Sequence, residues 1–321
     1  MKPAPCIPKL HIWTNQLLFL GVSHIPYREH QVVSDKLMVS IQGDITVTLK
    51  NGAKIITRSC LAKSGTTFDK QYIDATKATM AIYYLAPLTQ DYSALESLMF
   101  KALEGLHYNH PQEDLLIKQL LHIRNESLPP EQAYPILRNF IVQPQLQDVI
   151  FKEFDTRIIK VIQRIRETVS NNLSVKAFAE TVYLSESRLE KLFKEQIGVP
   201  ITKYRLRYRV FIGIIHLALG RSVTDAALSA GFSSSAHFSK SFSAINGVPP
   251  STTFLKPPFL EVFIANKVLD SMNGNTRHDE RKNSSTVHTL RNKNCTVPNR
   301  ESRKLLSSDN VCSRIVDKPK Q

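Results

Sequence analysis

The chain has 321 residues, of which 42% are hydrophobic, so it is long enough to bury at least one full hydrophobic core. Its four cysteines lack the spacing of a metal site or a redox motif, which indicates reduced thiols and a cytoplasmic location. No signal-peptide pattern opens the sequence, and its most apolar stretch, residues 210–219, is too short to span a bilayer, so we expect no membrane insertion.

The formal net charge of +14 is concentrated in the second half of the chain. Residues 1–154 contain 15 Lys and Arg against 14 Asp and Glu, residues 155–256 contain 15 against 7, and residues 257–321 contain 12 against 7. A nearly neutral first half and a basic second half indicate two functions. The basic part is expected to bind a polyanion, usually a nucleic acid. An anionic membrane surface is the rival partner, which the lack of a spanning segment disfavours.

Short strands with turn signals between them dominate the first 90 residues. In residues 45–49, isoleucine, valine and leucine alternate with threonine, which is typical of a strand with one buried face. Asn51-Gly52 follows and is a strong hairpin signal, because both residues tolerate the positive φ angles of a type I′ turn. The sequence therefore predicts a β-sandwich or β-barrel with strands at 16–20, 37–41, 45–50, 54–60 and 79–85.

Apolar residues at helical spacing follow these strands. They predict two amphipathic helices, at 93–106 and 112–124, and a short third helix at 134–142.

Residues 155–256 contain one pattern twice: a short helix with a small residue, a tight turn, a second helix with a phenylalanine and a lysine, and then Gly-Val-Pro. In the first copy, Ser174 is the expected N-cap and Ala179 the small residue, and the second helix is expected at 186–196. In the second copy, Ala227 is the small residue and Gly231 the turn glycine. A long helix at 201–219 is expected to join the copies. It is basic at its start and apolar almost all round at its end, so we expect the end to be buried.

The order, spacing and duplication of these motifs resemble the DNA-binding domain of the AraC/XylS family of transcription regulators. That resemblance implies two recognition helices that enter successive major grooves of double-stranded DNA, about 34 Å apart. By strand order alone, the front domain resembles the cupin-type sensing barrel of such regulators. This second resemblance implies a small-molecule effector or a partner that biases DNA binding or contact with RNA polymerase. The middle helices resemble the family's dimerisation and coupling helices, which implies a homodimer. The equally favoured alternative is that these helices are ordinary amphipathic helices that cover the barrel.

Residues that point away from the core of each recognition helix are the candidates for DNA contact. They are Ser187, Arg188, Lys191 and Lys194 in the first motif, and Ser234, Ser235, His237 and Lys240 in the second. The family's pattern also places Glu190 at a base-contacting position. For this residue we prefer the interpretation that its side chain simply lies on a solvated face of the helix. The joining helix contributes three expected phosphate clamps, for which a solvated face is again the alternative: Arg205, Arg207 and Arg209.

Three departures from the family's pattern predict a relaxed or divergent sequence specificity. Tyr183 replaces the usual turn glycine of the first motif, where a positive φ costs a tyrosine energy. Gly213 lies inside the joining helix, where glycine costs about 1 kcal/mol. Both recognition helices place a lysine where the family often has arginine, and lysine lacks the bidentate fork that pairs with guanine.

Metal-binding cupin barrels use clusters of histidines, and the sequence lacks such a cluster. The front domain contains His11, His24 and His30, and the family's H-x-H position reads Arg28-Glu29-His30. Phe68 stands where a further histidine is expected. We therefore predict no metal ion and no cofactor. An effector in the barrel would contact residues of its inner face, namely Phe19, Val39, Ile41, Phe68 and Tyr83. The alternative is that these residues only form the hydrophobic core.

The back of the chain begins at Pro257-Pro258. Residues 259–269 are a brief apolar segment, expected to be a helix packed on the preceding domain. From Ser271 the sequence is rich in Ser, Asn, Thr, Arg and Lys, which is typical of disorder. Its charge would add non-specific affinity for DNA, or the tail is inert.

The sequence thus predicts an α+β chain in four parts. These are a cupin-like β-barrel sensing domain (1–90), connecting or dimerisation helices (91–154), an all-α domain with two helix-turn-helix motifs (155–256) and a basic, disordered tail (257–321). The expected function is sequence-specific transcription regulation, without catalysis. A non-specific architectural DNA binder is the alternative. A cupin enzyme with a regulatory tail is disfavoured, because no set of histidines with a carboxylate has barrel spacing.

Overall fold

The computed structural model describes most of the chain up to residue 289. The described residues are 7–22, 27–28, 32, 34–48, 52–66, 72–74, 78–101, 106–141, 153–246, 248–255, 260–273 and 287–289. By their contacts, residues 1–290 form one unit and residues 291–321 a second, so every described residue lies in the first unit.

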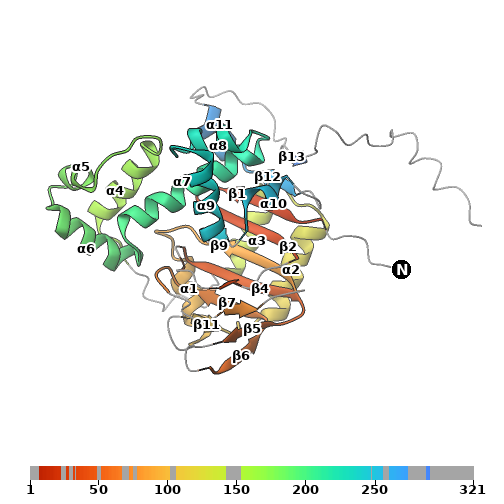
Figure 1. The fold of residues 1–321 in the computed structure, drawn as a ribbon. Helices are drawn as coiled ribbons and strands as arrows, with labels where there is room; N and C mark the ends of the chain where they lie inside the picture. Colours follow the sequence, from red (N-terminus) through yellow and green to blue (C-terminus); the bar gives the residue numbers. More distant parts are fainter. Residues whose placement is uncertain are drawn as a thin grey trace, which may run out of the picture. The chain divides into compact units, whose positions relative to one another are not determined.

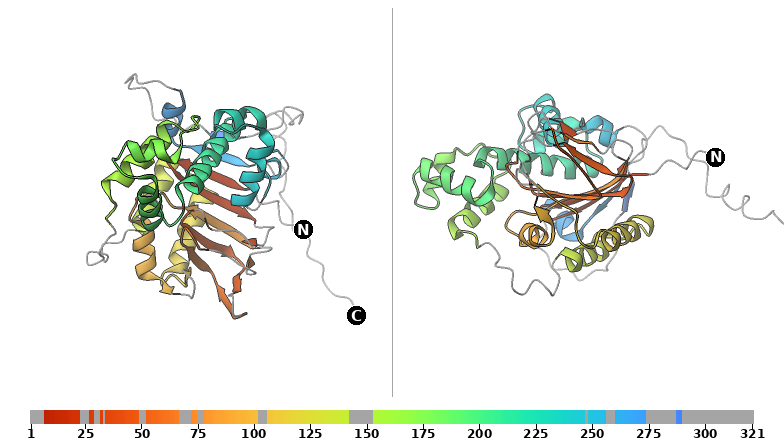
Figure 2. Two further views of the ribbon diagram at one scale, coloured as in Figure 1. Left: turned by 60° about the vertical axis from the view of Figure 1, so that its left-hand side comes forward. Right: turned by 90° about the horizontal axis from the view of Figure 1, so that it is seen from below.

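A nine-stranded sheet is the largest element of the fold, and its strands run side by side in Figures 1 and 2. Their order is β10-β11-β7-β4-β9-β2-β1-β12-β13. The bounds are β1 Lys9–Trp13, β2 Gln16–Val22, β4 Lys36–Gln42, β7 Ser59–Ala62, β9 Thr79–Tyr84, β10 Phe100–Lys101, β11 Leu106–Tyr108, β12 Glu261–Ile264 and β13 Val287–Thr289.

A smaller sheet has four strands in the order β3-β8-β5-β6. Their bounds are β3 Tyr27–Arg28, β5 Ile45–Thr48, β6 Lys54–Thr57 and β8 Tyr72–Asp74. Over the described residues, neither order returns to its first strand, so the sheets do not close into the predicted barrel. The α+β class is confirmed, whereas the closed, cupin-like barrel is not.

The predicted hairpin is present in the small sheet. Strand β5 pairs with β6 in antiparallel register, from Ile45 opposite Thr57 to Thr48 opposite Lys54. Gly52 in the connection has φ +80, as the turn requires, and Asn51 lies outside the described residues. The predicted return strand at 54–60 divides into β6 and β7, which belong to different sheets.

Three helices follow the strands: α1 Asp91–Leu98, α2 Glu113–Asn125 and α3 Pro130–Ile141. The last two confirm the predicted helices. The predicted helix at 93–106 is wrong in its second half, because Met99 has extended backbone and Phe100 then pairs with Tyr108 of β11. Helical spacing of apolar residues misleads here, since a short strand that pairs non-locally can carry the same residues.

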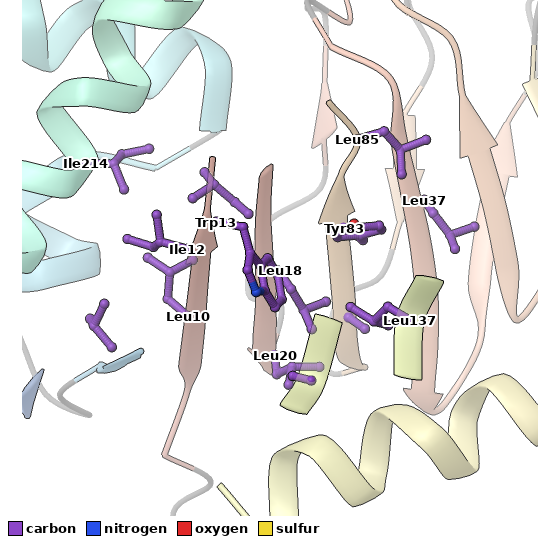
Figure 3. Packing of buried hydrophobic residues seen from close by; sticks show 14 of the residues in the cluster. Leu10, Ile12, Trp13, Leu18, Leu20, Leu37, Tyr83, Leu85, Leu137 and Ile214 are labelled. Carbon is purple, nitrogen blue, oxygen red and sulfur yellow. The ribbon is translucent and has the colours of Figure 1, made fainter. Parts of the chain in front are cut away.

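Strand β1 is buried on both faces. Its odd-numbered side chains bond carbonyl oxygens near the α2–α3 connection: Lys9 Nζ donates to Arg124 at 2.6 Å, His11 Nε2 lies 2.9 Å from the oxygen of Leu128, and Trp13 Nε1 donates to Pro130 at 2.9 Å. On the other face, Leu10 and Ile12 point toward Ile214 of the helix α7 (Ile201–Ala218), and all three belong to one buried apolar cluster (Figure 3).

The segment after the basic domain rejoins the sheet. Strand β12 pairs in parallel with β1, from Lys9 opposite Glu261 to Ile12 opposite Ile264. The helix α11, Asn266–Asn273, follows. The structure therefore differs from the expected tail at residues 260–273, which form a buried strand and then a helix. Among the described helices, none is long and apolar enough to cross a membrane.

Candidate nucleic-acid interface

The first motif is built from three short helices around one apolar cluster. Helix α4, Thr156–Glu167, begins at its N-cap Asp155, which accepts a hydrogen bond from the backbone of Arg157 at 2.9 Å. Its apolar face is buried, at Ile158, Ile162 and Ile165. They pack with the residues of the next two helices in a single cluster.

Serine caps set the ends of the next two helices. Ser174 caps α5, Val175–Glu180, by accepting from the backbone of Ala177 at 3.1 Å, as predicted. Ser185 caps α6, Glu186–Ile197, by accepting from the backbone of Arg188 at 3.3 Å. The sequence reasoning missed the second cap, although a serine one residue before a charged helical stretch is the usual signal.

Helix α6 has one buried and one exposed face. Leu189, Leu192 and Phe193 are buried. Four predicted contact residues and Glu190 are exposed. Because residues three and four apart are neighbours on a helix, the outward residues share a face: Ser187, Arg188, Lys191 and Lys194.

The second motif repeats this arrangement with α8, Val223–Ser229, and α9, Ser235–Asn246. Ser222 caps α8 by accepting from the backbone N–H of Asp225 at 3.1 Å, and its hydroxyl donates to the Asp225 carboxylate at 2.6 Å. Ser234 accepts from the backbone of His237 at 3.2 Å, so its hydroxyl is engaged at the start of α9. The predicted contact residues are exposed apart from Ser235, which is half-buried: Ser234, His237 and Lys240.

Helix α7 joins the two motifs, and its arginines are engaged within the chain. Arg205 donates to the carbonyl oxygen of Leu173 at 2.6 Å and lies over the ring of Phe178 at 5.2 Å. Arg209 donates to the carbonyl oxygens of Val169 at 3.0 Å and of Asn171 at 3.1 Å. These bonds fix the α4–α5 connection on α7, which differs from the expected open phosphate clamps.

Arg207 differs even more from the expectation. It lies near the carbonyl oxygen of Leu85, at 3.4 Å, and burial lowers the pKa of its guanidinium. Burial also lowers the pKa values of Arg205 and Arg209. All three arginines are therefore engaged within the chain, and they lie outside the exposed faces of α6 and α9.

Two special backbone positions in the motifs were noted from the sequence. Tyr183 has φ +54 and Gly231 has φ +80, so both turns adopt the left-handed conformation that the resemblance implies. Close packing explains why a glycine stands at position 213, because a β-carbon there would lie 2.4 Å from Cε2 of Phe238. This glycine allows α7 and α9 to pack closely, which offsets its cost within a helix.

The described residues contain no group of three or more His, Cys, Asp or Glu that could hold a metal ion. His24, His30 and Phe68, which bear on the metal prediction, lie outside the described residues. His11 is fully buried, and burial lowers its pKa to about 4, so it is neutral at physiological pH.

A small apolar cavity lies between the large sheet and the helices α2 and α3. Its volume is about 10 Å³, which is room for about one water molecule. Two of the residues predicted to line an effector site, Val39 and Tyr83, are among its lining residues, together with Leu37, Ala81, Leu116, Leu120, Leu137 and Ile141.

Comparisons with known proteins bear on the basic domain first. Residues 178–256 match the family model of a helix-turn-helix domain. The arabinose operon regulatory protein of Escherichia coli (strain K12) is 26% identical over 108 residues. That match covers 33% of this chain and only 37% of the length of the relative.

Solved structures resemble a larger part of the chain. A single-residue variant of ToxT from Vibrio cholerae strain SCE256, solved in the apo state, has a TM-score of 0.53 at 15% identity, over 75% of this chain and 97% of that one. ToxT from Vibrio cholerae O395 has a TM-score of 0.51 at 14% identity, over 74% and 96%. Wild-type ToxT from strain SCE256, described as bound to an unsaturated fatty acid, has a TM-score of 0.50 at 15% identity, over 75% and 96%. At these identities the likeness concerns the fold.

The chain therefore contains a helix-turn-helix domain that follows a sheet-rich domain. The helix-turn-helix domain is of the AraC type. In this domain the chain is similar to regulators of the AraC/XylS family.

Proposed function

We propose that α6 and α9 read two successive major grooves of one DNA duplex and that the chain regulates transcription through this sequence-specific contact. The duplicated, serine-capped helix with an exposed polar face is the observation that supports the proposal. A recognition helix offers the residues of its first turns to base edges. The excess of Lys and Arg in residues 155–256 attracts the phosphate backbone.

The two caps assign equivalent roles to residues of the two helices. Lys191 lies six residues after the cap Ser185, and Lys240 lies six residues after the cap Ser234. Both lysines are exposed, and we expect them to contact bases or flanking phosphates. Arg188 and His237 are equivalent in the same way, three residues after each cap. Ser187, Lys194 and Ser235 complete the proposed surface.

Selection of bound sequences from a random pool of duplex DNA tests this proposal. The full chain is used near physiological salt. We expect an enriched site with two boxes whose centres are about 34 Å apart, one helical turn. The double variant Lys191→Ala and Lys240→Ala is the control, and it should lose the enrichment. No enrichment, with affinity that simply falls as salt rises, would favour the non-specific architectural binder instead.

For the sheet-rich domain we propose a sensing role, with an apolar effector. The cavity beside Val39 and Tyr83 supports this role, since it lies between a sheet face and two amphipathic helices. Because it holds about one water, an effector would have to move α2 or α3 aside. The unsaturated fatty acid of the ToxT structure suggests the first ligands to try. A homodimer and a contact with RNA polymerase stay predictions.

Thermal unfolding with a series of fatty acids tests the sensing role. A ligand that binds the folded chain raises Tm with its concentration. The variant Ala81→Val fills the cavity and should lose that rise, while its Tm without ligand stays within a few degrees of the wild type. No rise for any fatty acid would contradict this choice of effector.

A further inference from the structure

The turn between α5 and α6 displays a tyrosine that the fold does not use. The side chain of Tyr183 is 96% exposed. Its neighbours Val182 and Leu184 both pack in the apolar cluster of the first motif. Because the residues on either side point inward, the tyrosine side chain lies outside the turn.

The backbone of this turn is held by hydrogen bonds on both sides of Tyr183. Its own N–H donates to the carbonyl oxygen of Glu180 at 3.3 Å, and the N–H of Leu184 donates to Ala179 at 3.1 Å. Together with the cap Ser185, these bonds impose the left-handed conformation on the residue at position 183. A tyrosine at φ +54 costs folding free energy that a glycine would not.

The second motif provides an internal comparison. Gly231 takes the same place after α8, four residues after the small Ala227, as Tyr183 takes four residues after Ala179, and its φ is +80. A β-carbon there would meet the carbonyl oxygen of Val169 at 2.7 Å, so the second turn has room only for glycine. The first turn accepts a large residue because its outside is open. Folding alone favours glycine in both turns, which points to a role for Tyr183 in binding.

The position of Tyr183 indicates the partner. It lies two residues before the cap of α6, at the end of the helix that carries Ser187 and Arg188. In helix-turn-helix proteins this end of the recognition helix approaches the DNA, and groups beside it bond phosphate oxygens. A tyrosine hydroxyl is one of the donors that make such contacts, and the N-terminus of a helix favours a nearby anion.

We propose that the Tyr183 hydroxyl donates a hydrogen bond to a backbone phosphate beside the groove that α6 enters. The inference rests on the proposed function, because it requires α6 to face DNA. It adds a residue that anchors only the first of the two motifs.

Two variants of the full chain separate the hydroxyl from the backbone strain. Tyr183→Phe keeps the strain and removes the donor, so Tm should stay unchanged while affinity for duplex DNA falls by about three- to tenfold. Tyr183→Gly removes both, so Tm should rise by about 2 °C or more while affinity falls at least as far. Phe100→Ala, which removes another exposed aromatic side chain, should leave affinity unchanged.

Affinity is measured on the selected site and on random duplex at several salt concentrations. A phosphate contact is independent of sequence, so Tyr183→Phe should weaken both equally. Because tyrosine is neutral, the dependence of log affinity on log salt should keep its slope. If the wild type binds both duplexes with equal affinity and Tyr183→Phe still lowers both affinities, the proposed sequence-specific function is contradicted, whereas the phosphate contact of Tyr183 is supported.

Three results would overturn the inference. The first is that Tyr183→Phe binds both duplexes as tightly as the wild type. The second is that DNA affinity is unchanged while transcription in a purified system falls, which would assign Tyr183 to a protein partner. The third is that the wild type binds no duplex at all, which would remove the proposed function as well.

Discussion

Gly65 and Gly198 touch backbone to backbone. A β-carbon on Gly65 would lie 2.5 Å from the carbonyl oxygen of Gly198, and one on Gly198 would lie 2.5 Å from that of Ser64. Both glycines have positive φ, +94 and +86. Gly198 ends the recognition helix α6, and Gly65 lies in the turn after β7, which Asp35 holds by accepting from the N–H of Ser64 at 2.6 Å. The sheet-rich domain thus contacts the end of α6.

Replacing Gly65 by alanine should disrupt this contact. The matched control is Gly52→Ala, since Gly52 has φ +80 and nothing within 4 Å of its added β-carbon. Both changes introduce backbone strain of about 1 kcal/mol, but only Gly65→Ala also forces two backbones apart. We expect a larger fall in Tm for Gly65→Ala and faster amide exchange at the end of α6. Equal Tm values and equal exchange for the two variants would contradict the expected role of the contact.

Alanine at position 213 should destabilise the chain. Helix propensity alone favours Gly213→Ala by about 1 kcal/mol. However, the new methyl group would lie 2.4 Å from the fully buried ring of Phe238, and overpacking costs about 1–3 kcal/mol. We therefore expect a net loss of stability in urea unfolding. The double variant Gly213→Ala with Phe238→Leu should recover part of it, whereas a more stable single variant would show that the ring moves aside easily.

Local patterns in the sequence were sufficient to predict both helix-turn-helix motifs. The structure agrees with the expected N-cap Ser174, the outward Lys191 and the left-handed turn at Tyr183, and each of these depends on neighbours within a few residues. Strand β12 was missed because its partner β1 lies some 250 residues earlier, and four apolar residues carry no signal for such a distant parallel pairing. The engaged Arg205 and Arg209 were missed for a related reason. Their carbonyl acceptors come from a loop that helical spacing cannot place beside them.

Single replacement of Lys191 or Lys240 by alanine should weaken each motif separately. Each change is expected to cost about 1–3 kcal/mol of binding free energy at the selected site and to relax the sequence of one box only. If the lysine bonds a phosphate instead, affinity should fall on every sequence and the salt slope should decrease by about 1. Binding titrations over a range of salt distinguish the two. Lys267→Ala, an exposed lysine in α11, is the control and should behave as the wild type. Two lysine variants that bind as tightly as Lys267→Ala would show that these faces do not contact DNA.

Mild acid should destabilise the folded chain through its buried histidines. Burial lowers the pKa of His11 to about 4 and that of His110 to about 4, against about 6.5 in an unfolded chain. As pH falls from 6.5 toward 4, the unfolded chain therefore binds protons that the folded chain does not. Stability should be complete above pH 6.5 and fall toward pH 4, by up to about 3 kcal/mol for a fully buried histidine.

Urea unfolding between pH 7.5 and 5 measures this loss, in a range where few carboxylates titrate. His11→Gln should be less stable than the wild type at pH 7.5, because glutamine fills the site poorly and weakens the bond to the carbonyl oxygen of Leu128. Its stability should nevertheless depend less on pH, since one of the groups that resist protonation is gone. His122→Gln, a change at an exposed histidine of α2, should keep the pH dependence of the wild type. If His11→Gln keeps it too, His11 does not take up its proton on unfolding in this range.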